Sequence, residues 1–73
     1  MKPMKTPLTK RQRAILEFVV KFMEKKGYPP TRAEICEGFE FSSANSAECY
    51  LRAIARKGYI KMIPGISRGL VVL

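Results

Sequence analysis

The chain has 73 residues, 47% of them hydrophobic, and its Lys and Arg outnumber its acidic residues to give a net charge of +8. This length allows one small domain, and the apolar content excludes a disordered chain. A large enclosed active site is also excluded, because three or four short elements cannot both form a core and wall a cavity. No apolar run is long enough to span a bilayer, and we find no signal-peptide pattern.

The basic charge gathers toward the two ends of the chain. Residues 1–13 hold five Lys or Arg and no acid, and residues 50–73 hold another five and no acid. Residues 31–49, in contrast, hold one Arg and four Glu. A strongly basic balance favours polyanionic partners, with nucleic acid ahead of an anionic membrane. A protein that binds polyanions only by charge does not require an acidic segment. Residues 31–49 are therefore expected to have a different role in binding.

The two cysteines, Cys36 and Cys49, match neither a CxxC motif nor a zinc-binding set, and the chain has no His. Because four nitrogen or sulfur ligands cannot be assembled within one molecule, we expect no metal site. Nothing in the sequence indicates a cofactor. A disulfide scaffold of this size usually has more bridges. The sequence therefore predicts reduced thiols and a cytoplasmic protein.

The first part of the chain predicts a flexible arm followed by a long helix. Residues 1–8 form the arm, since they contain two prolines that discourage regular structure. Thr9 and Gln12 form a capping box that starts a helix over residues 10–26, and Gly27 ends it. The apolar stripe of this helix has helical spacing and comprises Ile15, Phe18, Val19, Phe22 and Met23.

A short second helix and a turn follow. Thr31 and Glu34 form another capping box, which predicts a helix over residues 32–39. The residues from 39 to 43 predict a tight turn, in which Glu40 is an unusual residue.

The third helix begins after a serine. Ser42 or Ser43 can cap it, and Gly58 ends it. Its inward face is predicted to contain Ala47, Tyr50, Leu51 and Ile54.

The last part of the chain changes to the alternation that is typical of strands. Residues 59–63 and 69–73 are predicted strands, and residues 64–67 (PGIS) supply the turn that joins them into a hairpin. One face of this hairpin is expected to combine Ile60 and Met62 with two residues of the second strand.

The order helix, helix, turn, helix, hairpin predicts a mainly α (α+β) fold: a three-helix winged helix-turn-helix with a C-terminal β-hairpin wing. Residues 32–52 form the helix-turn-helix and residues 59–73 form the wing of a single domain, 1–73. The aromatic side chains could also suggest a base-stacking surface, but their helical spacing favours the core. The predicted core comprises Ile15, Phe18, Val19, Phe22, Ile35, Phe39, Leu51, Ile54 and Ile60.

In this architecture the third helix enters the major groove with its N-terminal residues facing base edges. Ser43, Asn45, Ser46 and Glu48 occupy those positions. Asn pairs with adenine, Glu accepts from cytosine N4, and Ser can serve either purpose. Because an acid repels phosphate, Glu48 makes more sense as base readout than as a backbone contact. The alternative is that Glu48 is merely solvated and pairs with Arg52 at i+4.

Three segments resemble the LexA repressor family. Residues 29–35 (PPTRAEI) match a family segment of the same sequence, residues 53–60 (AIARKGYI) resemble its ALARKGVI, and residues 65–70 (GISRGL) resemble its wing, GASRGI. The likeness extends from Leu8 to Leu73. It implies a bacterial, nucleoid-associated repressor of DNA-damage (SOS) genes that binds palindromic operators in double-stranded DNA as a homodimer. In the full-length family, RecA-stimulated self-cleavage relieves repression.

The family's base-contacting residues carry over one at a time. Its serine, asparagine and first recognition glutamate fall on Ser43, Asn45 and Glu48. The alanine beside that asparagine becomes Ser46, and the second glutamate becomes Cys49. The resemblance therefore implies base readout by Ser43, Asn45, Ser46, Glu48 and Cys49.

Two further departures are Glu40 at the family's turn glycine and Ala44 at its proline. All these departures lie at the DNA face and the turn, so they leave the fold prediction unchanged. The family's usual operator sequence is not carried over.

Contacts to the DNA backbone are expected from basic residues on the second helix, the third helix and the wing. Arg68 has the best case on the wing, because a wing tip borders the DNA backbone in this fold. The predicted backbone set is Arg32, Arg52, Arg56, Lys57 and Arg68.

The resembled family has a C-terminal domain with a Ser-Lys dyad, a scissile Ala-Gly bond and the dimer interface, none of which is found up to Leu73. We expect this chain to have no enzymatic activity, because a nucleophile needs a positioned base. The isolated domain is expected to be mainly monomeric, since no exposed apolar stripe is left for an interface. It is either an excised DNA-binding domain or a stand-alone regulator of phage or plasmid type.

Two other classes of function compete with DNA binding. One is a winged-helix module for protein interaction, and the other is a domain that binds anionic membranes through its first helix. The basic flanks and the polar recognition face argue against the former. The apolar stripe of the first helix is needed for the core, which argues against the latter.

Overall fold

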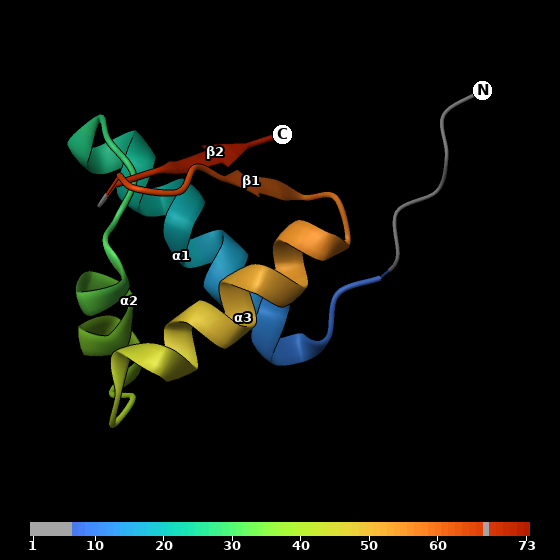
Figure 1. The fold of residues 1–73 in the computed structure, drawn as a ribbon. Helices are drawn as coiled ribbons and strands as arrows, with labels where there is room; N and C mark the ends of the chain where they lie inside the picture. Colours follow the sequence, from blue (N-terminus) through green and yellow to red (C-terminus); the bar gives the residue numbers. More distant parts are fainter. Residues whose placement is uncertain (1–6, 67) are drawn as a thin grey trace.

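The computed structural model describes residues 7–66 and 68–73, and within them it shows three helices and one two-stranded antiparallel sheet (Figure 1). The predicted winged helix-turn-helix architecture is therefore confirmed. Most of the predicted arm, residues 1–6, and Ser67 in the predicted hairpin turn lie outside the described residues. The elements are α1 (Lys10–Lys26), α2 (Arg32–Phe39), α3 (Ala44–Arg56), β1 (Ile60–Met62) and β2 (Leu70–Val72).

The helix starts follow the predicted caps, with one difference. In both capping boxes the Thr hydroxyl accepts from a backbone N–H three residues later, from Gln12 at 3.2 Å and from Glu34 at 3.1 Å. The side chains of Gln12 and Glu34 accept in return from the backbone N–H of the Thr. Ser43 has the predicted N-cap position of α3, but its side chain makes no capping hydrogen bond.

A residue with a left-handed backbone conformation lies at the end of each helix or shortly after it. The sequence indicated such a residue for two of the three helices. Gly27 after α1 has φ 83° and Gly58 after α3 has φ 91°. The residue that ends α2 is Glu40, with φ 57° and ψ 37°. It takes this conformation while the N–H of Phe41 donates to the carbonyl of Cys36 at 2.9 Å, so the turn satisfies a carbonyl at the end of α2.

The core lies between the three helices and the hairpin. Six of the predicted core residues are buried, together with Ala47 and Leu70, which the predicted core omits. The prediction was wrong for Phe18, Phe22 and Phe39, which are only half-buried. Their rings are too large to be covered completely by so short a chain. They instead join a series of ring contacts along the edge of the core, with centroids 5.4–6.1 Å apart, in the order Tyr28, Phe22, Phe18, Phe39, Phe41 and Tyr50.

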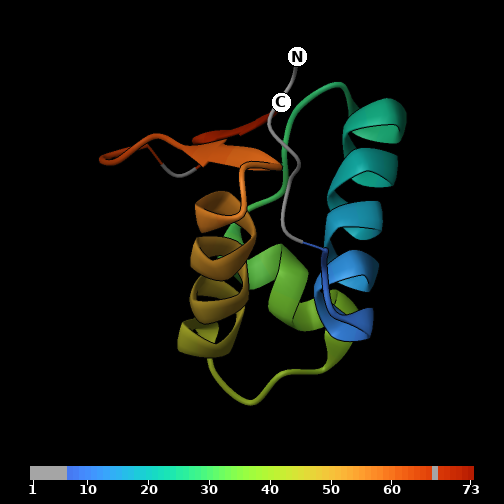
Figure 2. The ribbon, with the colours of Figure 1, turned by 90° about the vertical axis from the view of Figure 1, so that its right-hand side faces the viewer.

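The hairpin register places its apolar side chains as predicted. Ile60 pairs with Val72 and Met62 pairs with Leu70, so these four side chains share the inner face of the sheet. Figure 2 shows the hairpin lying over the C-terminal end of α3, where β1 packs against that helix.

The hairpin exposes more apolar side chains than expected. Ile63, Ile66, Val71 and Leu73 are all exposed. The expectation of no exposed apolar stripe therefore does not hold for the wing, where four apolar side chains are exposed, and the monomeric state stays a prediction. None of the helices that the structure describes is long and apolar enough to cross a membrane.

Candidate nucleic-acid interface

The outward face of α3 is polar and basic. Ala47, Leu51 and Ile54 form the buried face of this helix. The opposite face is an exposed stripe with a spacing of three or four residues, which runs from the polar N-terminal end to the basic C-terminal end of α3. We call Asn45, Cys49, Arg52 and Arg56 the α3 stripe.

The remaining residues predicted for base readout lie beside this stripe. Ser43 is exposed at the N-terminus of α3, and Ser46 is half-buried. Cys36 and Cys49 are both free thiols. The Cys36 thiol donates to the carbonyl of Ser43 at 3.3 Å, so it connects α2 to the start of α3.

Glu48 lies between two arginines. Its Oε1 is 2.8 Å from Nε of Arg32 and its Oε2 is 2.7 Å from Nη2 of Arg52. Of the two roles considered for Glu48, the pairing with Arg52 is thus present, although it does not exclude a contact with a base. The contact with Arg32 joins α2 to α3 and has no counterpart in local sequence patterns.

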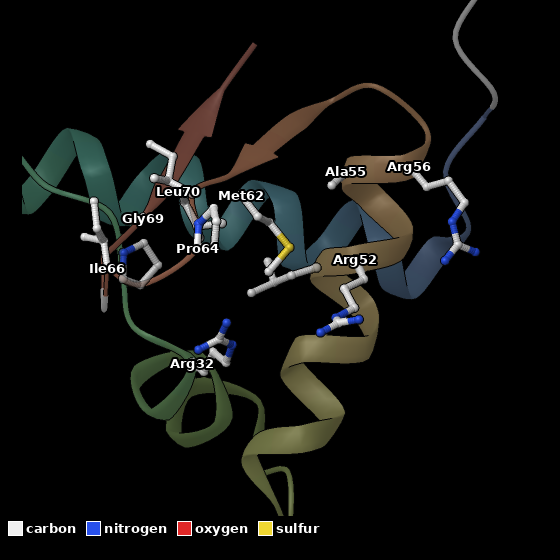
Figure 3. A pocket seen from close by; sticks show the side chains of 12 residues that line it. Arg32, Arg52, Ala55, Arg56, Met62, Pro64, Ile66, Gly69 and Leu70 are labelled. Atoms are coloured by element: carbon white, nitrogen blue, oxygen red, sulfur yellow. The ribbon is translucent and has the colours of Figure 1, made fainter.

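A groove of about 570 Å³ is lined by residues of α2, α3 and the wing. In Figure 3, Arg32 of α2 and Arg52 of α3 point toward one another across this groove, and Arg56 lies farther along α3. Its apolar lining comes from the core edge and the wing, and comprises Pro30, Leu51, Ala55, Met62, Ile63, Pro64, Ile66 and Leu70. The groove therefore combines three cations with an apolar floor.

Arg68 does not extend from the tip of the wing. Its guanidinium makes a bidentate contact with Glu34, through Nη1 to Oε1 at 2.7 Å and Nη2 to Oε2 at 3.1 Å. The Nη1 atom also donates to the carbonyl of Pro29 at 2.8 Å, and the guanidinium lies 4.5 Å from the centroid of the Tyr28 ring. The hydrogen bond from Arg68, followed by the backbone hydrogen bond from Thr31, lowers the pKa of Glu34 from 4.5 to about 2.

Lys57 also contacts the protein itself. Its Nζ donates to the carbonyl of Pro7 at 3.0 Å and to Oε1 of Gln12 at 2.6 Å. It thereby ties the end of α3 to the start of α1 and to the segment that precedes it.

The predicted backbone set thus separates into two groups. Arg32, Arg52 and Arg56 line the groove, whereas Lys57 and Arg68 are engaged with other parts of the fold. The sequence reasoning missed the wing residues that line the groove, among them Pro64 and Ile66. Two isoleucines flanking the Pro-Gly turn were the available signal, because turn tips are normally polar.

Comparison with known families decides which fold family this arrangement represents. The pattern of the LexA DNA binding domain matches residues 5–69. This chain belongs to the LexA DNA-binding domain family. The match confirms the resemblance drawn from the three sequence segments, and it covers the helix-turn-helix and the wing up to the residue before β2.

Individual LexA repressors are similar to this chain over most of its length. The LexA repressor of Halorhodospira halophila is 57% identical over 63 residues, which are 86% of this chain and 28% of that protein. The LexA repressor of Haemophilus influenzae is 51% identical over 67 residues, which are 92% of this chain and 32% of that protein. The chain therefore spans about three-tenths of the length of these relatives.

Proposed function

We propose that this chain binds double-stranded DNA sequence-specifically, as the DNA-binding part of a transcriptional repressor of LexA type that acts on DNA-damage operators. The observation that carries the proposal is the position of the α3 stripe directly beside a groove lined by three arginines. Membership of the LexA family supports the same function.

The N-terminal part of α3 would read bases in the major groove. Asn45 is exposed and can form a bidentate contact with adenine, and Ser43 and Ser46 can contact several bases. Cys49 stands on the same face, one turn further along the helix. A small thiol offers weaker hydrogen bonding than a carboxylate, so its contribution would be close packing against a base edge.

The groove suits one strand of the DNA backbone. Arg32, Arg52 and Arg56 carry the charges that phosphates require, and Arg presents several donors in a planar fork. The apolar floor, with Met62 and Ile66, can pack against deoxyribose rings. The groove thus offers both charge for phosphates and apolar surface for deoxyribose rings.

Arg68 and Lys57 would serve this interface indirectly. Because Arg68 is held by Glu34 and Pro29, it fixes the wing against the start of α2. Lys57 fixes the chain before α1 against the end of α3. We therefore assign backbone contact first to the three arginines of the groove and positioning to Lys57 and Arg68.

Repression needs more than one copy of this domain. We propose that two copies bind the two half-sites of a palindrome and that a C-terminal domain joins them, since tethering gives the second copy a high effective concentration. Self-cleavage stimulated by RecA belongs to this proposal only for a full-length protein that has the protease domain. Alone, the domain would bind one half-site weakly.

A competition titration tests the proposal. An operator is first selected from a pool of random duplexes, and binding to it is compared with binding to a scrambled duplex. Asn45→Ala is expected to cost about 1–3 kcal/mol on the selected operator and little on the scrambled one. Arg56→Ala should weaken both complexes alike and reduce the salt slope by about one unit. Lys21→Ala, an exposed cation of α1, serves as the control.

Two results would contradict this assignment. If Asn45→Ala weakens both complexes equally, α3 does not read the sequence. If no duplex is selected and retardation stays weak at all salt concentrations, the domain is better described as a protein-interaction module. The exposed apolar side chains of the wing, Ile63, Ile66, Val71 and Leu73, are the observation that keeps this second function open.

A further inference from the structure

Both oxygens of the Glu48 carboxylate contact groove arginines in the free protein. Each of its oxygens has its own partner, Arg32 at 2.8 Å and Arg52 at 2.7 Å. The two arginines come from different helices and line the groove assigned above to the DNA backbone. The carboxylate thus occupies the two arginines that would otherwise bind a DNA phosphate.

We propose that Glu48 acts as an internal substitute for a DNA phosphate, and that Arg32, Glu48 and Arg52 together determine specificity by limiting binding to non-cognate DNA. The inference rests on the proposed function and deepens it. In the free protein Glu48 neutralises one of the two positive charges and holds both guanidinium groups. The arginines become available to phosphates only when the carboxylate finds another partner.

The right base sequence supplies that partner. The amino group N4 of cytosine donates to a carboxylate, so a cytosine opposite Glu48 takes over the carboxylate and releases the arginines. On other sequences the exchange leaves a carboxylate without a donor beside the phosphates, which is unfavourable. The base contact of Glu48 and the phosphate contacts of Arg32 and Arg52 are therefore coupled.

The exposure of the three side chains makes such an exchange feasible. The side chains of Arg32 and Arg52 are 46% and 66% exposed, and that of Glu48 is 26% exposed. Ion pairs with this much solvent contact are weak, because water and salt screen them. The bridge can therefore open when DNA arrives, without disturbing the buried face of α3.

The first experiment removes the charge of Glu48 without changing its size. Binding of Glu48→Gln to a mixed-sequence duplex is measured by fluorescence anisotropy over a series of salt concentrations. We expect roughly tenfold tighter binding than wild type and a salt slope that is steeper by about one to two units, because two arginines become free for phosphates. Glu17→Gln, at an exposed residue of α1, removes the same charge away from the bridge. It should tighten binding less than about twofold, because salt screens distant charges.

A mutant cycle then tests whether the arginines act through Glu48. Arg52→Gln is made in the wild type and in Glu48→Gln, and both pairs are titrated with the mixed-sequence duplex. We expect the loss of Arg52 to weaken binding several-fold more in the Glu48→Gln background, because only there is the guanidinium already free. A merely structural role of Glu48 predicts no such difference. Thermal unfolding of each variant, followed by circular dichroism, shows that the compared proteins are folded.

The outcomes separate this inference from the proposed function. Equal effects of Glu48→Gln and Glu17→Gln, or equal losses from Arg52→Gln in the two backgrounds, would overturn the inference. If the wild type shows no preference for any selected duplex, the proposed function fails instead. The measurements on mixed-sequence DNA still decide whether the bridge restrains the arginines in that case.

Discussion

Glu40 stores backbone strain at the end of α2. It is the one non-glycine residue with positive φ in the part of the chain that the structure describes. A side chain in the left-handed region costs about 1–2 kcal/mol, because its Cβ approaches the following carbonyl. The sequence marked Glu40 as unusual for a turn, and the structure supplies the reason.

Replacing this residue by glycine is expected to stabilise the domain. Glu40→Gly should raise the free energy of unfolding by about 1 kcal/mol, since relief of strain exceeds the larger entropy of glycine in the unfolded chain. Glu37→Gly in the interior of α2 is the control and should lower it by about 1 kcal/mol. Urea unfolding at neutral pH measures both values. Destabilisation by both substitutions would show that Glu40 is not strained.

At the scale of the elements, the contact between Arg68 and Glu34 joins the wing to α2. Arg68 lies shortly before β2. Its contacts with Glu34, with the carbonyl of Pro29 and with the ring of Tyr28 hold this part of the wing at the start of α2. The wing thus has a defined position beside the groove even though its strands have only three residues each.

This contact predicts how stability depends on pH. The pKa of Glu34 is lowered to about 2 in the folded chain, chiefly by the hydrogen bond from Arg68 and then by the backbone hydrogen bond from Thr31. A carboxyl group with a lowered pKa stabilises the fold above its unfolded pKa, here 4.5, and this contribution is lost as the pH falls through about 2.

We therefore expect the melting temperatures of wild type and Arg68→Gln to differ most above pH 4.5 and to converge as the pH approaches 2. Circular dichroism melts at closely spaced pH values measure this difference. Arg13→Gln removes an exposed cation of α1 and should show no such convergence. A difference that stays constant down to pH 2 would mean that the Glu34 pair does not hold the wing.

At the scale of the whole molecule, stability depends on a single small core. Leu51 is 1% exposed in α3, the helix that contacts α1, α2 and β1. A chain of this size rarely has more than about 3–5 kcal/mol of stability from its core. One cavity at this position therefore affects the complete fold.

Leu51→Ala is expected to cost about 2–5 kcal/mol, so that much of the protein is unfolded at room temperature. Leu73→Ala deletes the same atoms from a side chain that is 65% exposed, and should change stability by less than about 0.5 kcal/mol. Urea unfolding followed by circular dichroism compares the two. Similar effects of both substitutions would show that Leu51 is not central to the core.

The sequence by itself determined the elements and their order. The signals that define the elements act over only a few residues, so the sequence is enough to predict them. They are the capping boxes at Thr9 and Thr31, the glycines after two helices and the alternation around Ile60. The exposed stripe of α3 followed in the same way from helical spacing. These local signals were enough to predict the architecture, the hairpin with its Ile60 and Met62 face, and the face of α3 that carries Asn45 and Cys49.

Tertiary structure alone decided which polar and charged groups meet across different elements. Arg32 reaches Glu48, Arg68 reaches Glu34 and Lys57 reaches Pro7 because the packing of helices and wing brings distant residues together. No local spacing encodes these pairs, so the sequence placed all five cations in one predicted backbone set. The fold separates them into groove arginines and structural contacts. The physical reason is distance along the chain. Sequence periodicity gives information about residues within one or two helical turns, whereas these contacts depend on how whole elements pack against one another.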